Sequence, residues 1–118
     1  MNESNPSDAA LAELLTLTME VDTCGETSYR NHLGQAHRIH GPAVIHTDGT
    51  TSWWLNGKRH RDHGPAVIWA GGSKSWYQNG LLHRTDGPAI ESPSYGRYWY
   101  LNGEHLTEEE FNERVKSM

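Results

Sequence analysis

The chain has 118 residues, a net charge of −5 and one cysteine, Cys24. A lone cysteine excludes an internal disulfide and a CxxC metal or redox site. The excess of basic residues in the middle of the chain is too small to predict duplex DNA as a partner. Only 35% of the residues are hydrophobic, but five Trp and five Tyr supply large apolar surfaces, so we expect a single folded domain over 1–118. No membrane span is expected, and the predicted location is the cytoplasm.

The first segment, 1–23, is predicted to be an acidic, helical N-terminal cap. Through residue 26 it carries six acidic residues and no Lys or Arg. Its apolar stripe has helical spacing and indicates a helix near 7–20. The stripe consists of Leu11, Leu14, Leu15 and Thr18. Covering the first repeat is the expected role of this helix, and docking on a basic target is the alternative.

Three tandem repeats of 23 residues fill 37–105, after a degenerate half-repeat at 24–36. The repeats read HRIHGPAVIHTDGTTSWWLNGKR, HRDHGPAVIWAGGSKSWYQNGLL and HRTDGPAIESPSYGRYWYLNGEH. Each contains Asn-Gly, whose residues tolerate positive φ at both centres of a two-residue turn, and this pair is the strongest short-range hairpin signal. The sequence therefore predicts a mainly β fold, a single antiparallel sheet of β-hairpin repeats with a capping helix at each end.

Alternation along the predicted strands assigns residues to two faces of the sheet. One aliphatic position per repeat is expected to be buried, and the residues there are Val44, Val67 and Ile90. Two adjacent aromatic positions must point to opposite faces. They form two predicted ladders, Trp53 with Trp76 and Trp99, and Trp54 with Tyr77 and Tyr100. One ladder is expected to line the core, which leaves the other as an apolar patch or as a surface covered by a partner.

The last segment, 106–118, is predicted to be a helix. Thr107 and Glu110 have the spacing of a capping box, and Leu106 and Phe111 are placed to form a hydrophobic staple. The acidic first turn and the basic last turn both suit the helix dipole. We expect this helix to close the C-terminal end of the repeat sheet.

The order aromatic, x, Asn-Gly-Lys-x-His, Gly and then Asp-Gly resembles MORN-type repeats. The units His83–Ala89 and Leu106–Phe111 are similar to those of small phage and bacterial proteins. The resemblance covers about 37–111 and implies an antiparallel sheet used for protein binding or scaffolding. It also implies a phage or prophage origin and action by occluding a host protein, such as a defence or toxin component. Ser52, Ser75 and Tyr98 stand where the MORN pattern has Gly, which argues against the phospholipid binding of that family.

A non-catalytic protein-binding surface is the primary functional prediction, because Trp, Tyr and Arg are the residues most often found as interface anchors. The candidate partner-binding residues are Trp54, Tyr77, Tyr100, Arg38, Arg61, Arg84 and Trp69. A two-fold homodimer through the same surface is a further option. No enzyme motif is present, no catalytic residue is assigned, and no cofactor is expected.

Two ligand hypotheses compete with protein binding. The Arg38, Arg61 and Arg84 ladder beside aromatic rings could sequester a nucleotide or a single nucleic-acid strand, whereas the structural alternative is that each arginine packs on the Trp of the neighbouring unit. Any metal site would use two His-x-x-His pairs, and its ligands would be His37, His40, His60 and His63. The competing role for the second histidine of each pair is to bond backbone N–H groups at the turn before Gly-Pro.

Overall fold

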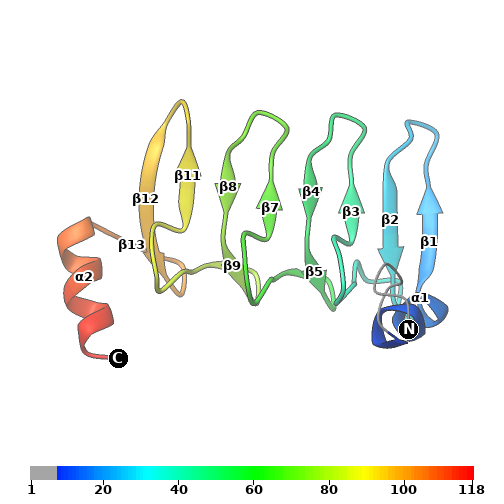
Figure 1. Ribbon diagram of the computed structural model, residues 1–118, viewed down its shortest axis with the longest axis horizontal. Helices are drawn as coiled ribbons and strands as arrows, with labels where there is room; N and C mark the ends of the chain where they lie inside the picture. Colours follow the sequence, from blue (N-terminus) through cyan, green and yellow to red (C-terminus); the bar gives the residue numbers. More distant parts are fainter. Residues whose placement is uncertain (1–7) are drawn as a thin grey trace.

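A computed structural model describes residues 8–118. Their dominant feature is one nine-stranded antiparallel sheet with a helix at each end (Figure 1). The strands follow the order β1-β2-β3-β4-β7-β8-β11-β12-β13 across the sheet, and two further pairs, β5–β6 and β9–β10, form small hairpins. The longest dimension, 45 Å, reflects the stacking of the units in a row. The predicted mainly β repeat sheet with two terminal helices is confirmed.

Each repeat contributes an upper hairpin and a lower hairpin, named for their positions in Figure 1. The first hairpin precedes the repeats and joins β1 (Thr18–Val21) to β2 (Thr27–Arg30). The upper hairpins join β3 (Val44–Ile45) to β4 (Thr51–Ser52), β7 (Val67–Ile68) to β8 (Lys74–Ser75), and β11 (Ile90–Ser92) to β12 (Gly96–Leu101). The lower hairpins join β5 (Trp54–Leu55) to β6 (Lys58–Arg59), β9 (Tyr77–Gln78) to β10 (Leu81–Leu82), and the end of β12 to β13 (Glu104–Leu106).

Asn-Gly turns close all three lower hairpins. Asn56 and Gly57 have φ values of 49° and 82°, and the same conformation recurs in the other two turns. Positive φ at both central residues matches the right-handed twist of the flanking strands. The turns therefore fix the register, which pairs Trp54 with Arg59 across the first lower hairpin.

Backbone hydrogen bonds join one unit to the next with the period of the sequence. The N–H of Trp53 donates to the carbonyl of Ala66 at 2.6 Å, and that of Trp76 donates to Ala89 at 2.8 Å. A histidine side chain makes a recurring bond within each unit, since His60 Nδ1 accepts the backbone N–H of Asn79 at 3.0 Å. The equivalent links use His37 with Asn56 and His83 with Asn102. Recurrence of the same side chains every 23 residues thus produces a repeated set of bonds.

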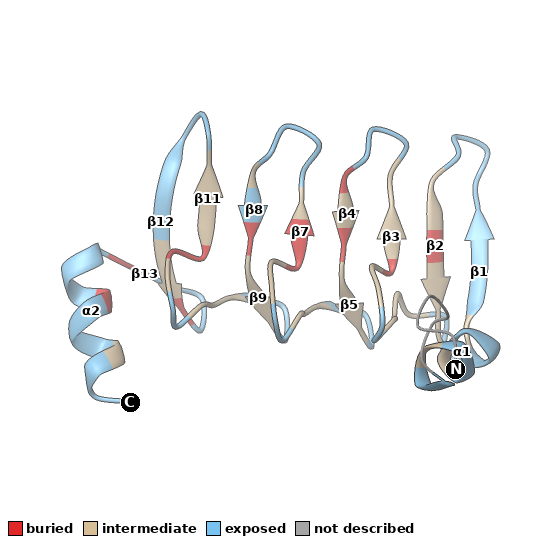
Figure 2. Cartoon of the chain, viewed as in Figure 1, coloured by how far each residue is buried: buried red, intermediate tan, exposed pale blue. Residues whose placement is uncertain are grey.

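The interior of the sheet is built from small side chains. Ala43, Ala66 and Ala89 have no exposed surface, and Ser52 and Ser75 are also buried. Figure 2 shows these buried positions as a band across the bases of the upper hairpins. The expectation for the aliphatic position holds for Val67 alone, because Val44 and Ile90 are half-buried. Trp53, Trp76 and Trp99 are likewise half-buried, so neither aromatic ladder forms the centre of the core.

The C-terminal end is closed as predicted. Helix α2 (Glu108–Lys116) starts with a capping box in which the Thr107 hydroxyl accepts the Glu110 N–H and the Glu110 carboxylate accepts the Thr107 N–H. These backbone bonds hold the pKa of Glu110 below its ordinary value. Phe111 packs with Leu101 and Leu106 in a buried cluster, which confirms the hydrophobic staple.

The N-terminal end differs from its prediction. Helix α1 spans Asp8–Thr16 and is followed at once by β1, so the predicted helix over 7–20 is too long, and its first residue lies outside the described part of the chain. Thr18 belongs to β1, whose pairing with β2 outweighs the helical spacing of the leucines. Helix α1 contains no buried residue, so it covers the first unit far less closely than α2 covers the last. Neither helix within 8–118 has the length and apolar character needed to cross a membrane.

Candidate functional site

The most continuous candidate surface follows the lower hairpins. Trp54, Tyr77 and Tyr100 stand at equivalent places on β5, β9 and β12, and each is paired across its hairpin with one residue of the returning strand. We call these six residues the lower row, and they are Trp54, Arg59, Tyr77, Leu82, Tyr100 and His105. The first five are half-buried and His105 is exposed. The lower row therefore runs across all three repeats and stays accessible along its length.

Contacts within the lower row join neighbouring units. The Arg59 guanidinium carbon lies 5.3 Å from the ring centre of Trp54 and 5.5 Å from that of Tyr77 in the next unit. Arg59 Nε is buried and bonds no other atom within the described residues. At the other end, the rings of Tyr100 and His105 are stacked with their centres 4.9 Å apart. Arg59 thus acts as a bridge between two aromatic rings, a role that sequence reasoning missed.

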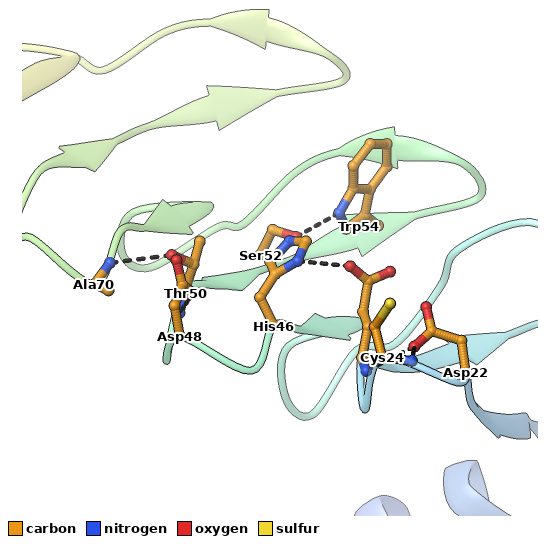
Figure 3. Close-up of polar contacts among 9 residues, drawn as sticks. Asp22, Cys24, His46, Asp48, Thr50, Ser52, Trp54 and Ala70 are labelled. Carbon is orange, nitrogen blue, oxygen red and sulfur yellow. Dashed lines mark hydrogen bonds and ion pairs between the residues drawn. The ribbon is translucent and has the colours of Figure 1, made fainter.

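Polar contacts hold Trp54 and link the upper turns, as Figure 3 shows. Trp54 Nε1 donates to the buried Ser52 hydroxyl at 2.8 Å, which fixes the indole in the lower row. Between the upper turns, His46 Nδ1 lies 2.6 Å from a carboxylate oxygen of Glu26, and the Thr50 hydroxyl accepts the Ala70 N–H at 3.1 Å. These bonds tie neighbouring upper turns to each other and hold the Trp54 indole against Ser52.

The arginines predicted to flank this surface are used elsewhere. Arg38, Arg61 and Arg84 lie over Tyr29, Trp53 and Trp76, at 4.2, 3.8 and 3.8 Å from the ring centres. This arrangement confirms the packing of each arginine on the aromatic residue of the preceding unit. The backbone N–H groups of these arginines donate to the carbonyls of Trp54, Tyr77 and Tyr100 at 3.0, 3.3 and 3.3 Å. Their guanidinium groups lie over other rings, and Arg59 supplies the guanidinium beside Trp54 and Tyr77.

Each stacked arginine is also fastened to its own Gly-Pro turn. Arg61 Nη1 donates to the carbonyl of Pro65 at 3.1 Å, and a Cβ added to Gly64 would lie 2.9 Å from the Arg61 guanidinium carbon. A side chain at Gly64 would therefore displace the guanidinium from this position, and the same arrangement recurs at Arg38 and Arg84. Burial lowers the pKa of Arg61 from its ordinary value.

Two grooves lie on the arginine side, one repeat apart. The first encloses about 370 Å³ above Trp53, and the second about 630 Å³ above Trp76, with Arg61 in the wall of both. In the first groove, a carboxylate oxygen of Asp62 lies 2.8 Å from His60 Nε2, within hydrogen-bond distance. In the second, Arg84 Nε donates to Asp86 at 2.8 Å, which lowers the pKa of that carboxyl.

The grooves give little support to the nucleotide hypothesis. A base would need an open aromatic face, but one face of Trp53 and one of Trp76 are already covered by a guanidinium. A phosphate would need free guanidinium forks, but each fork bonds a proline carbonyl, and that of Arg84 also bonds carboxylates. The Nη1 of each guanidinium is therefore bonded within the chain, while the buried Arg38 Nε has no hydrogen-bond partner among the described residues.

The remaining predicted positions do not converge on one site. Within residues 8–118 no three His, Cys, Asp or Glu side chains are close enough to hold a metal ion, so the His37, His40, His60 and His63 set is not assembled. His37 and His60 accept backbone N–H groups instead. Asp86, which occupies the position of His40 and His63 in the third repeat, bonds Arg84. Trp69 is 39% exposed but lies in an upper turn, away from the lower row.

Comparison of the chain with protein-family models, with curated proteins and with solved structures gives no match.

Proposed function

We propose that the protein is a non-catalytic repeat protein that binds another protein through the lower row. The observation that carries this proposal is that Trp54, Tyr77 and Tyr100 form one accessible line with Arg59 across three repeats. Trp, Tyr and Arg are the side chains most enriched among residues that dominate binding energy. Repeat arrays also favour extended contact surfaces, because equivalent positions recur at a fixed spacing.

Rigidity of the lower row supports the same function. The indole of Trp54 is held by Ser52, and Arg59 is held between two rings, so binding would immobilise few additional side chains. The two helices stand at the ends of the array rather than along the lower hairpins (Figure 1). Since the repeats resemble those of phage and bacterial proteins, a bacterial host protein is the partner class that we propose to test first.

The test compares a triple variant with the wild type. Trp54→Ser, Tyr77→Ser and Tyr100→Ser together should reduce partner capture from a bacterial lysate at least about tenfold, because they remove the aromatic anchors of the surface. Capture is quantified by mass spectrometry, and circular dichroism reports whether the variant is folded. Hydrogen exchange on the purified complex should then show protection along 54–59, 77–82 and 100–105.

A matched control removes aromatic residues of the upper turns. Trp69→Ser with Tyr95→Ser deletes two exposed rings outside the lower row and should leave capture unchanged. Full capture by the folded triple variant, or protection confined to the arginine-side grooves, would reject the lower row as the binding surface. Loss of capture in the control variant would move the site to the upper turns.

A further inference from the structure

The two ends of the sheet differ in how they meet the solvent. At the C-terminal end, α2 buries Phe111 against the last strands. At the N-terminal end, every residue of β1 is exposed, as its pale blue colour in Figure 2 shows, and α1 contains no buried residue. The exposed large apolar residues of this end are Leu11, Leu14, Leu15, Met19 and Val21. Residues 8–118 therefore leave an apolar surface uncovered at the N-terminal end.

Strand β1 also presents backbone groups that can accept another strand. Met19 is opposite Tyr29, whose N–H donates to Ala43 at 2.7 Å and whose carbonyl accepts from His37 at 3.0 Å. Both backbone groups of Tyr29 thus point away from β1, and Met19–Tyr29 is a non-hydrogen-bonded pair. The N–H and C=O of Met19 must point outward from the sheet edge, and by alternation those of Val21 do too.

The usual protections of an edge strand are missing from β1. Its sequence, TMEV, has no Lys, Pro or Gly, and its one charged residue, Glu20, is 3.4 Å from Arg30. Neighbouring carboxylates are also engaged, since Glu13 accepts the backbone N–H of His40 at 2.9 Å. The open edge therefore offers apolar side chains and outward backbone groups. The carboxylates of Glu13 and Glu20 contact groups of their own chain.

We propose that β1 pairs antiparallel with β1 of a second copy, so that two nine-stranded sheets join end to end around a two-fold axis. The outward backbone groups belong to Met19 and Val21, so hydrogen-bonded pairs across the axis join odd-numbered residues. An axis at Met19 places each Met19 opposite its counterpart and each Thr18 opposite the Glu20 of the second copy. An axis at Glu20 would instead oppose two carboxylates, which is destabilising.

Helix α1 adds apolar area to this interface. It ends at Thr16, directly before β1, and lies at the foot of that strand (Figure 1). With the axis at Met19, Val21 of the second copy reaches the start of β1, beside the exposed Leu14 and Leu15. The lower row lies on other hairpins, so both copies keep it free, and this inference does not depend on the proposed function.

Sedimentation equilibrium of the whole chain tests the interface. The wild type should approach twice its 13.3 kDa mass as concentration rises. Met19→Pro removes an outward N–H without removing a bond to β2, so this variant should stay monomeric and folded. Met19→Lys should do the same by charging the edge, while Leu33→Lys, at an exposed loop residue, should leave dimerisation unchanged. A wild type that is monomeric throughout, or a dimer that survives both Met19 variants, would overturn the proposal.

Cysteine cross-linking tests the register. In a Cys24→Ser background, Met19→Cys should form an intermolecular disulfide under mild oxidation, because its Cα atoms would be about 5.5 Å apart. Val21→Cys is the matched control, because Met19 and Val21 are almost equally exposed, at 58% and 59%. With the axis at Met19, however, Val21 does not lie opposite Val21 of the second copy. Equal cross-linking at both positions, or none at Met19, would contradict an axis at Met19.

Discussion

Replacing Phe111 with alanine should lower the free energy of unfolding by about 3–5 kcal/mol, the cost typical of removing a buried aromatic ring. Phe111 is only 4% exposed and packs with Leu101 and Leu106, so the substitution leaves a cavity where α2 meets the sheet. A loss of this size is a large part of the stability of a domain of this length. Chemical denaturation measures it, and hydrogen exchange should show α2 and β13 opening first.

The other helix provides the control. Leu15→Ala removes an aliphatic side chain that is 88% exposed on α1, and we expect a change within about 0.5 kcal/mol. Measurements should be made at concentrations at which the chain is monomeric, because dimerisation would stabilise the wild type. Similar losses for Phe111→Ala and Leu15→Ala would mean that the two helices cap the sheet equally, contrary to the burial described above.

Replacing Ala66 with leucine should destabilise the protein by about 1–3 kcal/mol or more. Ala66 is fully buried at the centre of the array, and its N–H and C=O bond Ser75 and Trp53 at 2.8 and 2.6 Å. A larger side chain cannot be accommodated without moving the strands of two neighbouring units. Thermal and chemical unfolding should both show the loss.

Ala70→Leu is the matched control for this substitution, because Ala70 is exposed in an upper turn. We expect its effect to stay within about 0.5 kcal/mol. A well-tolerated Ala66→Leu would contradict the description of the interior as a close-packed band of alanine and serine.

Much of the architecture follows from local signals in the sequence. Asn56-Gly57 and its equivalents specify the lower hairpins, and the Thr107–Glu110 spacing specifies the start of α2. Alternation separates Trp54 from Trp53, and the two rings do have different contacts, since Trp53 lies under Arg61 and Trp54 lies beside Arg59. A two-residue turn at Asn56-Gly57 also implies the pairing of Trp54 with Arg59, so the sequence held the signal for the missed arginine.

Other features depend on tertiary contacts that no local pattern reports. The burial of Ala66 follows from strand neighbours in two units, whereas hydropathy favours the larger Val44 and Ile90. Arg61 folds back over Trp53 because the chain turns at Gly64, and alternation cannot be extended through such a turn. Strand β1 forms because β2 offers it a partner, although the spacing of the preceding leucines favours a helix.

Residue-resolved amide hydrogen exchange of the free protein tests the stacked repeat sheet most directly. The amides of Tyr29, Trp53 and Trp76 donate to Ala43, Ala66 and Ala89 of the following units, so all three should be strongly protected and should exchange with similar free energies. Strong protection at these three amides, which lie 24 and 23 residues apart along the chain, is the predicted result. Fast exchange at these three amides, or protection without that spacing, would contradict a continuous sheet and with it the lower row as a single surface.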